Sequence, residues 1–260
     1  MTISQMKRFV HITDEHHPYI INAVYDYDNP KNETPLIKFL KDFQPNILIQ
    51  GGDQLDLEVV SHWNKGKPRI TEGKRLKNDY DTYNTVLDQR EKVLKSLESH
   101  YMLEGNHDWW IQDTLDKYPE FEGLIEIQTN LHLSQRGIKW IGRRKHVNVG
   151  RLSIIHGDYK DGYLPVYAAK AIAQIYGRSI AYGHQHVNQT YSAQTPFDKH
   201  PYQVWGIGCL SHVNTEWRRN QPSAWLNSFG YGYVYAGGMF DYKVINIIGD
   251  KFIAEGELYK

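Results

Sequence analysis

Five short polar clusters in this sequence contain the residue types that hold metal ions and transfer protons. Each cluster follows an apolar run that is typical of a strand. Imidazole nitrogens mixed with carboxylate and amide oxygens suit divalent Mn, Fe, Co or Zn better than Ca or Mg. The sequence therefore predicts a metal centre assembled from separate segments. In chain order the clusters are Asp14-Glu15-His16 and residues 52–56 (GDQLD), 105–108 (GNHD), 156–158 (HGD) and 183–186 (GHQH).

The apolar runs before the clusters predict the strands that must position them. Open α/β sheets place their ligand sites at the carboxyl ends of strands, so the clusters are expected to meet at a sheet edge. Helices are predicted at 34–43 and 76–97, where apolar residues recur with helical spacing, and short β-type segments dominate from about 187 onward. This order indicates a layered α/β fold with two packed sheets. The strands predicted before 187 are 7–13, 46–50, 101–103, 139–141, 152–155 and 179–182.

The spacing inside the clusters predicts which side chains converge. In extended backbone, residues two apart point to the same side, so Asp14 and His16 are expected to face one centre. The same argument applies to His184 and His186. Adjacent residues diverge in this geometry, which predicts that Asn106 and its neighbour His107 serve as a ligand beside a catalytic group.

Length, charge and cysteine content exclude several classes of protein. The 260 residues carry 30 Lys+Arg and 30 Asp+Glu, and this zero net charge argues against a general DNA-coating protein. No apolar run is long enough to span a membrane, and the N-terminus lacks the apolar run of a signal peptide. A lone Cys209 makes no internal disulfide. We expect one cytoplasmic domain, 1–260, with a motif-bearing part at 7–192 and a β-rich part at 193–260 that completes the second sheet.

The clusters together resemble the calcineurin-like metallophosphoesterase superfamily, whose pattern runs DxH, GDxxD, GNH(D/E), H and GHxH. All five blocks occur here in that order, between Asp14 and His186. The resemblance implies an α/β fold, a layered α/β-β/α sandwich of two packed mixed sheets flanked by helices. The compact length, with residues 56–63 (DLEVVSHW) after the second block, is also similar to small bacteriophage members of the superfamily.

The resemblance also implies roles for individual residues. Two divalent ions are expected, with Mn²⁺ first and Fe, Zn, Co or Ni as alternatives, and a hydroxide between them attacks phosphorus in line. His107 protonates the leaving oxygen, and Asp56 orients the His107 ring. Asp53 bridges the two ions. The implied ligands are Asp14, His16, Asp53 and His186 for the first ion, and Asp53, Asn106, His156 and His184 for the second.

Other conspicuous residues have simpler structural interpretations. The basic stretch 65–77 is interpreted as a solvated surface loop, with a grip on substrate phosphates as the alternative. Alternating tyrosines at 231, 233 and 235 are interpreted as one face of a core strand, with nucleobase stacking by the C-terminal aromatics as the alternative. The remaining assignments are structural roles for His11 and His17, supporting roles for Glu15 and Asp108, a second basic patch at 143–146, and further aromatics at Trp205, Trp217 and Trp225.

The third block bears on the substrate. GNHD resembles the nucleases and nucleotide phosphodiesterases of the superfamily, whereas its Ser/Thr protein phosphatases use GNHE and follow the second aspartate with Arg-Gly. The leading hypothesis is a metal-dependent hydrolase acting on a phosphodiester of a nucleotide or nucleic-acid strand, without a membrane partner. A broad-specificity phosphomonoesterase is the alternative. A non-catalytic metal-binding scaffold is the remote alternative, because it predicts missing ligands and none is missing.

Overall fold

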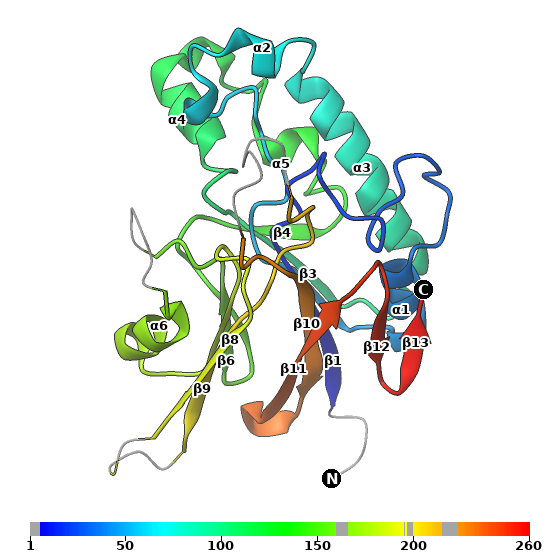
Figure 1. The fold of residues 1–260 in the computed structure, drawn as a ribbon, viewed down its shortest axis with the longest axis vertical. Coiled ribbons are helices and arrows are strands. Elements are labelled where there is room, and N and C mark those ends of the chain that lie inside the picture. The colour runs from blue at the N-terminus through cyan, green and yellow to red at the C-terminus, as the bar shows by residue number, and fades with distance from the viewer. Residues whose placement is uncertain (1–5, 160–165, 195, 197–199, 215–222) are drawn as a thin grey trace.

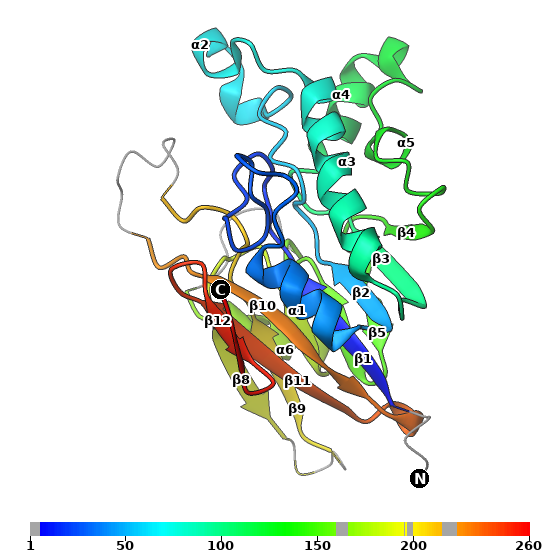
Figure 2. The same cartoon turned by 90° about the vertical axis from the view of Figure 1, so that its right-hand side faces the viewer.

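The computed structural model describes residues 6–159, 166–194, 196, 200–214 and 223–260. Two mixed β-sheets lie face to face, and helices cover their outer faces (Figures 1 and 2). This arrangement confirms the predicted layered α/β sandwich. Among the described helices, none combines the length and the hydropathy that a membrane-spanning segment requires.

The first sheet has a parallel half and an antiparallel half. Its strand order is β11-β10-β1-β2-β3-β4. The neighbours β1, β2, β3 and β4 are parallel, so their carboxyl ends share one edge, while β10 and β11 run antiparallel beside β1. The six strands are β1 (Lys7–Ile12), β2 (Ile47–Gln50), β3 (Ser99–Leu103), β4 (Ile138–Ile141), β10 (Asn227–Val234) and β11 (Phe240–Ile247).

The second sheet contributes two more parallel strand ends. Its order is β5-β6-β7-β9-β8, with β6, β7 and β9 parallel and the two edge strands antiparallel. Because β6 and β7 are neighbours, the clusters that follow them emerge side by side. The five strands are β5 (Val147–Val149), β6 (Leu152–Ile155), β7 (Ile180–Tyr182), β8 (Gln189–Ala193) and β9 (Tyr202–Gly206).

Three apolar layers hold the sheets and helices together. Helices α1 (Pro35–Phe43) and α3 (Leu76–Val93) lie on the outer face of the first sheet (Figure 2), and α6 (Ala168–Tyr176) covers the second (Figure 1). Alternation along β1 separates two of these layers: Phe9 packs between the sheets, and Val10 packs toward the helices. The remaining elements are α2 (Pro68–Thr71), α4 (Trp110–Lys117), α5 (Ile127–Asn130), η2 (His62–Asn64), η3 (Pro119–Phe121), η5 (Ala236–Gly238), β12 (Phe252–Ala254) and β13 (Glu257–Tyr259).

The predicted strands before residue 187 and both helices are present, but the second helix is shorter than expected. It begins at Leu76 as predicted and ends at Val93, not at 97. The side chain of Gln44 accepts hydrogen bonds from the backbone N–H groups of Lys95 and Ser96 at 2.9 and 3.2 Å. These bonds hold the chain outside the helix, and β3 begins at Ser99, two residues before the predicted start of that strand at 101.

The expectation that residues 193–260 complete the second sheet is wrong for most of that stretch. Only β9 joins the second sheet, whereas β10 and β11 extend the first sheet and β12 and β13 form a separate hairpin. The physical reason lies at β1, which would otherwise be an exposed edge strand. Pairing with β10 satisfies its backbone hydrogen-bonding groups.

Candidate metal centre

All five polar clusters emerge at the carboxyl ends of parallel strands, as the sequence predicted. They follow β1, β2 and β3 in the first sheet and β6 and β7 in the second. The loops after β1 and β2 remain paired beyond the strand ends. Asp14 N–H donates to the Gly52 carbonyl, and His16 N–H donates to the Asp53 carbonyl, both at 3.0 Å. These backbone hydrogen bonds alone hold the first two clusters beside each other.

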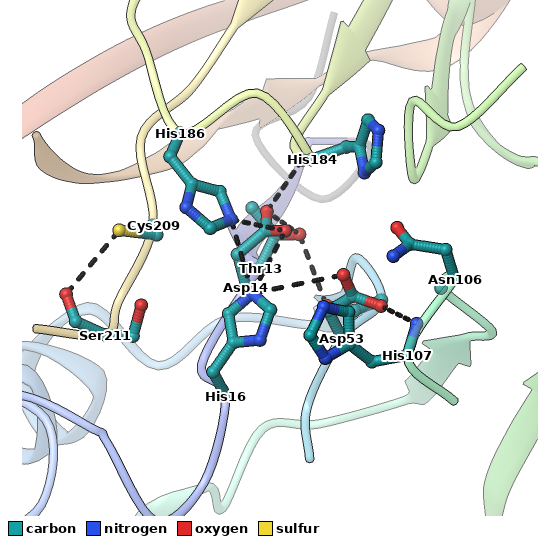
Figure 3. A network of polar contacts seen from close by, with 12 residues as sticks. Thr13, Asp14, His16, Asp53, Asn106, His107, His184, His186, Cys209 and Ser211 are labelled. Carbon is teal, nitrogen blue, oxygen red and sulfur yellow. Dashed lines mark hydrogen bonds and ion pairs between the residues drawn. The ribbon is translucent and has the colours of Figure 1, made fainter. Parts of the chain in front are cut away.

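One group of potential ligands combines the first and last clusters. The ligand atoms of Asp14, His16 and His186 all lie within 4.8 Å of one another (Figure 3). His186 Nε2 is 3.2 Å from Asp14 Oδ1 and 3.2 Å from His16 Nε2. Two ligands of one ion, each about 2.1 Å from it, lie about 3 to 3.4 Å apart, so this spacing suits a shared cation.

A second group lies on the other side of the Asp53 carboxylate. The ligand atoms of Asp53, His156 and His184 are again within 4.8 Å of one another. Asn106 joins them, since its Oδ1 is 3.1 Å from His156 Nε2. The structure thus brings together every residue that the sequence analysis expected for the second ion.

Asp53 connects the two groups through a single oxygen. Its Oδ2 lies 3.3 Å from His156 Nε2 and 3.9 Å from His16 Nε2. Its other oxygen, Oδ1, accepts a 2.8 Å hydrogen bond from the backbone N–H of His107. The carboxylate is therefore held in one orientation, with Oδ2 facing both sets of imidazoles.

The backbone that presents these side chains is not extended, contrary to the expectation. Asp14, His16, His184 and His186 have φ of 53°, 45°, 64° and 58°, all in the left-handed region, and Asp53 has 53°. Asp and His are among the residues that tolerate this region best, and such strain concentrates at functional sites. Asp14 and His16 do converge, but tight left-handed turns bring them together in place of strand alternation. His184 and His186 do not share a group: His184 lies with Asp53, and His186 lies with Asp14.

Two glycines of the clusters are required by close approach. A Cβ at Gly105 would lie 2.1 Å from Asp53 Oδ1, and one at Gly183 would lie 2.2 Å from Asp14 Oδ2. Any side chain at either position would displace a carboxylate of the centre. The glycines of GNHD and GHQH thus let separate loops pack tightly around Asp53 and Asp14.

The outer hydrogen bonds leave the inward ring nitrogens free for a cation. His156 Nδ1 donates to the Gly51 carbonyl at 3.0 Å, and His16 Nδ1 donates to Asp56 Oδ1 at 3.0 Å. Ligating histidines usually donate their second N–H to a carbonyl or carboxylate in this way. With Nε2 of both rings turned inward beside carboxylate and amide oxygens, the donor set fits a divalent ion of the Mn, Fe, Co or Zn type.

His107 stands beside the ligands with a different set of contacts. Its Nδ1 donates to the backbone carbonyl of Asp56 at 3.0 Å and lies 3.3 Å from Asp56 Oδ1. Burial alone would lower the pKa of His107, but the charges of Asp53 and Asp56 outweigh it and raise the pKa to about 9. Asp56 contacts His16 as well as His107, a double contact that the sequence did not reveal.

A cavity of about 150 Å³ opens over the two groups. Two of the residues that line it, Tyr19 and Ser211, were not singled out in the sequence, whereas Trp225 was named there among the C-terminal aromatics. Trp225 packs against His186, with ring centroids 4.2 Å apart. None of the three belongs to a polar cluster, and only the presence of Trp225 among the C-terminal aromatics hinted at one of them.

Comparison with known proteins identifies the family. A sequence profile of the calcineurin-like phosphoesterases matches residues 7–188, which include every polar cluster. The chain belongs to this family. Family members typically bind two divalent metal ions, and the clustered His and Asp side chains of this calcineurin-like phosphoesterase are arranged accordingly.

Three individual proteins are similar to this calcineurin-like phosphoesterase. The Gene 54 protein of Mycobacterium phage D29 is 23% identical over 270 residues, covering 98% of this chain and 99% of its own. Vps29 of Chaetomium thermophilum is 11% identical, with a TM-score of 0.39 over 92% of this chain and 96% of its own. A dimetal phosphatase of Danio rerio is 9% identical, with a TM-score of 0.38 over 89% and 94%.

The other residues singled out in the sequence lie outside the metal centre. His17 is buried and its Nδ1 hydrogen-bonds the Tyr27 hydroxyl at 2.7 Å, while His11 Nδ1 contacts the Tyr242 hydroxyl at 2.9 Å. Most of the basic stretch 65–77 is exposed as expected, but it is only partly a loop, since it contains α2 and the start of α3. Tyr231 packs in the core and Tyr233 packs partly against it, as predicted, but Tyr235 lies beyond the end of β10 and is exposed. Trp217 lies outside the described residues.

Metal binding to this calcineurin-like phosphoesterase is expected to release protons from two of its histidines. Burial would lower the pKa values of His156 and His186, but nearby groups outweigh it, chiefly Asp53 for His156 and Cys209 and Asp14 for His186. Both pKa values rise to about 10, above the usual 6.5. Both rings are therefore doubly protonated and positively charged at neutral pH in the metal-free protein. Because a cation binds only the neutral ring, metal affinity should increase with pH up to about 10.

Calorimetric titration with Mn²⁺ in buffers of different ionisation enthalpy measures the protons released. We expect His156 and His186 together to release about two protons per protein at neutral pH. The stability of the metal-free fold depends on pH in the opposite direction. The raised pKa values of His156 and His186 stabilise the fold below pH 6.5, and this stabilisation is lost as pH rises through about 10. Equal Mn²⁺ affinity at about pH 6 and about pH 9 would contradict the expectation.

Proposed function

We propose that this protein is a dinuclear-metal phosphodiesterase that hydrolyses a phosphodiester of a nucleotide or nucleic-acid strand. The observation that carries the proposal is the position of Asp53 Oδ2, which faces His156 Nε2 at 3.3 Å and His16 Nε2 at 3.9 Å. One carboxylate oxygen shared by two ligand groups suits a bridged pair of cations. When bound, two divalent ions would supply an activated water as nucleophile and neutralise the charge of the phosphate.

We propose that the ligands divide between the two ions as the resemblance implied. Asp53 would be common to both ions. The set of imidazole, carboxylate and amide donors suits several divalent ions, of which we propose Mn²⁺ first, with Fe, Zn, Co or Ni as alternatives. The neutral form of His184 is favoured because burial lowers its pKa to about 3, so that ring needs no proton loss to bind. The proposed ligands are Asp14, His16 and His186 for the first ion, and Asn106, His156 and His184 for the second.

His107 is the proposed general acid. With Nδ1 donating to the Asp56 carbonyl, its Nε2 is the atom left to carry a proton toward the cavity. Asp53 and Asp56 raise the pKa of His107 to about 9, which keeps the ring protonated at neutral pH in the metal-free protein. Cations bound at Asp53 would weaken that effect and bring the pKa closer to neutrality, where an acid is most effective. Asp56 holds the ring in place.

The cavity wall supports a diester as the substrate. Tyr19, Ser211 and Trp225 add uncharged, largely aromatic surface beside His186 and His16. A diester has a second organic group beside its leaving group, and an aromatic wall next to the phosphate position can contact a nucleoside. A monoester would offer that wall no such group.

The sheet pairing and the cysteine content bear on the domain organisation and on the cellular compartment. We propose that residues 1–260 form a single metallophosphoesterase domain, because β10 and β11 pair within the same sheet as the motif-bearing strands. Cys209 is a buried free thiol, which fits the reducing environment of the cytoplasm.

A substrate comparison tests this function. The Mn²⁺-loaded protein should hydrolyse bis(p-nitrophenyl) phosphate with a kcat/KM at least about 10-fold above that for p-nitrophenyl phosphate. EDTA should abolish both activities, and added Mn²⁺ should restore them. Preference for the monoester would move the assignment to a phosphatase. Absence of turnover with both ions bound would indicate a non-catalytic scaffold.

A further inference from the structure

A buried ion pair lies directly behind the first cluster. Glu15, between the proposed ligands Asp14 and His16, and Arg90 on α3 are each only 1% exposed. The guanidinium binds the carboxylate through both terminal nitrogens, with Nη1 3.0 Å from Oε2 and Nη2 in contact with Oε1. The pair spans the space between the helix and the carboxyl end of β1.

Further hydrogen bonds complete the surroundings of Glu15. The Tyr83 hydroxyl, also on α3, donates to Glu15 Oε2 at 2.6 Å. Gln50, the last residue of β2, donates from Nε2 to the same oxygen at 3.3 Å. Gln50 Oε1 in turn accepts a 2.8 Å hydrogen bond from His100 Nε2 on β3. The Glu15 carboxylate is therefore tied to one helix and to the strand beside its own.

Stability alone is a weak reason for such an arrangement. Removing two charges from water costs free energy that their attraction often fails to offset, and apolar replacements of buried ion pairs are frequently neutral or stabilising. The position of the pair is more informative. Glu15 points toward α3, while Asp14 and His16 point into the metal centre, and both of these neighbours have left-handed backbone.

We propose that the Glu15–Arg90 pair is a positioning device that holds Asp14 and His16 in the geometry required for the first metal ion. This inference rests on the proposed metal centre. Fixing the middle residue of a tight three-residue segment fixes the direction of the residues on either side. The arginine also occupies the Glu15 carboxylate, which therefore does not compete with Asp14 as a ligand.

A double variant separates positioning from stability. Glu15→Gln with Arg90→Met removes both charges while keeping similar volumes, so the protein is expected to fold with little change in metal-free thermal stability. Its affinity for Mn²⁺ at the first site should fall about 10- to 100-fold, as outer-shell changes usually produce. The rise in Tm caused by a fixed Mn²⁺ concentration should shrink accordingly. Calorimetry and thermal unfolding measure these effects without turnover.

Arg136→Met is the matched control. Arg136 also pairs with acidic residues of α3, Asp88 at 2.7 Å and Glu91 at 2.8 Å, but it contacts no proposed ligand. Its loss should leave Mn²⁺ affinity at the wild-type value. The conservative variant Arg90→Lys, which keeps the charge but not the two-nitrogen contact, should show a smaller loss of affinity than the double variant.

The outcomes distinguish the two proposals. Wild-type Mn²⁺ affinity in the double variant would overturn the positioning role while leaving the proposed function intact. Failure of the wild-type protein to bind Mn²⁺ would overturn the proposed function and the positioning role with it. If the double variant does not fold, Arg90→Lys decides, and wild-type affinity in that variant would overturn the inference.

Discussion

The variant Asp53→Asn should lose both metal ions and turnover together. An asparagine oxygen is a neutral, weaker ligand, and the nitrogen that replaces one oxygen carries protons that repel a cation. Because Asp53 Oδ2 faces both His16 and His156, the change acts on both sites at once. Metal analysis after gel filtration should give less than one equivalent of Mn²⁺. Turnover should fall by at least about 10³-fold, since bound cations contribute several kcal/mol to such reactions.

Asp79→Asn is the control for Asp53. Asp79 lies on α3 and is not among the proposed ligands, and burial, aided by Glu58 and Asp56, raises its pKa to about 6. Neutralising it should leave the Mn²⁺ content and turnover at wild-type values. Two full equivalents of Mn²⁺ in Asp53→Asn would refute the shared-carboxylate assignment. Loss of only one equivalent would place Asp53 in a single site.

The variant His107→Ala should keep its metal ions and lose turnover. The proposed ligand atoms do not include this ring, whose Nδ1 is bonded to the Asp56 carbonyl. Loss of a positioned acid usually lowers the rate by about 10² to 10⁴-fold when the leaving group needs a proton. The loss should be much smaller for thymidine 5′-(p-nitrophenyl) phosphate than for thymidine 5′-phenyl phosphate, because p-nitrophenolate leaves readily without protonation.

His62→Ala is the matched control for His107. His62 packs against the same Trp110 ring that contacts His107, yet it is exposed and belongs to no polar cluster. Its replacement should leave both thymidine esters at wild-type rates. Equal losses for the two esters in His107→Ala would count against the acid role. Loss of Mn²⁺ from that variant would make His107 a ligand.

Much of the metal centre could be predicted because its determinants are local. A strand that ends in a polar cluster delivers that cluster to the carboxyl edge of its sheet, and adjacent parallel strands place their clusters side by side. Asp14 and Asp53 therefore lie near one another as expected. His156 follows β6 of the second sheet and reaches Asp53 because the two sheets pack face to face. The left-handed backbone could not be predicted from spacing alone, since it depends on hydrogen bonds between neighbouring loops such as His16 N–H to the Asp53 carbonyl.

The sequence by itself determined which residue types could form the metal centre, their order along the chain and the layered fold that collects them. The tertiary structure alone decided that β10 and β11 join the first sheet, that Trp225 lines the cavity and that Arg90 stands behind Glu15. Partners 75 residues apart, such as Glu15 and Arg90, leave no periodic signal in the sequence. Their contact exists only after the helix has packed on the sheet, because burial between those two elements brings the charges together.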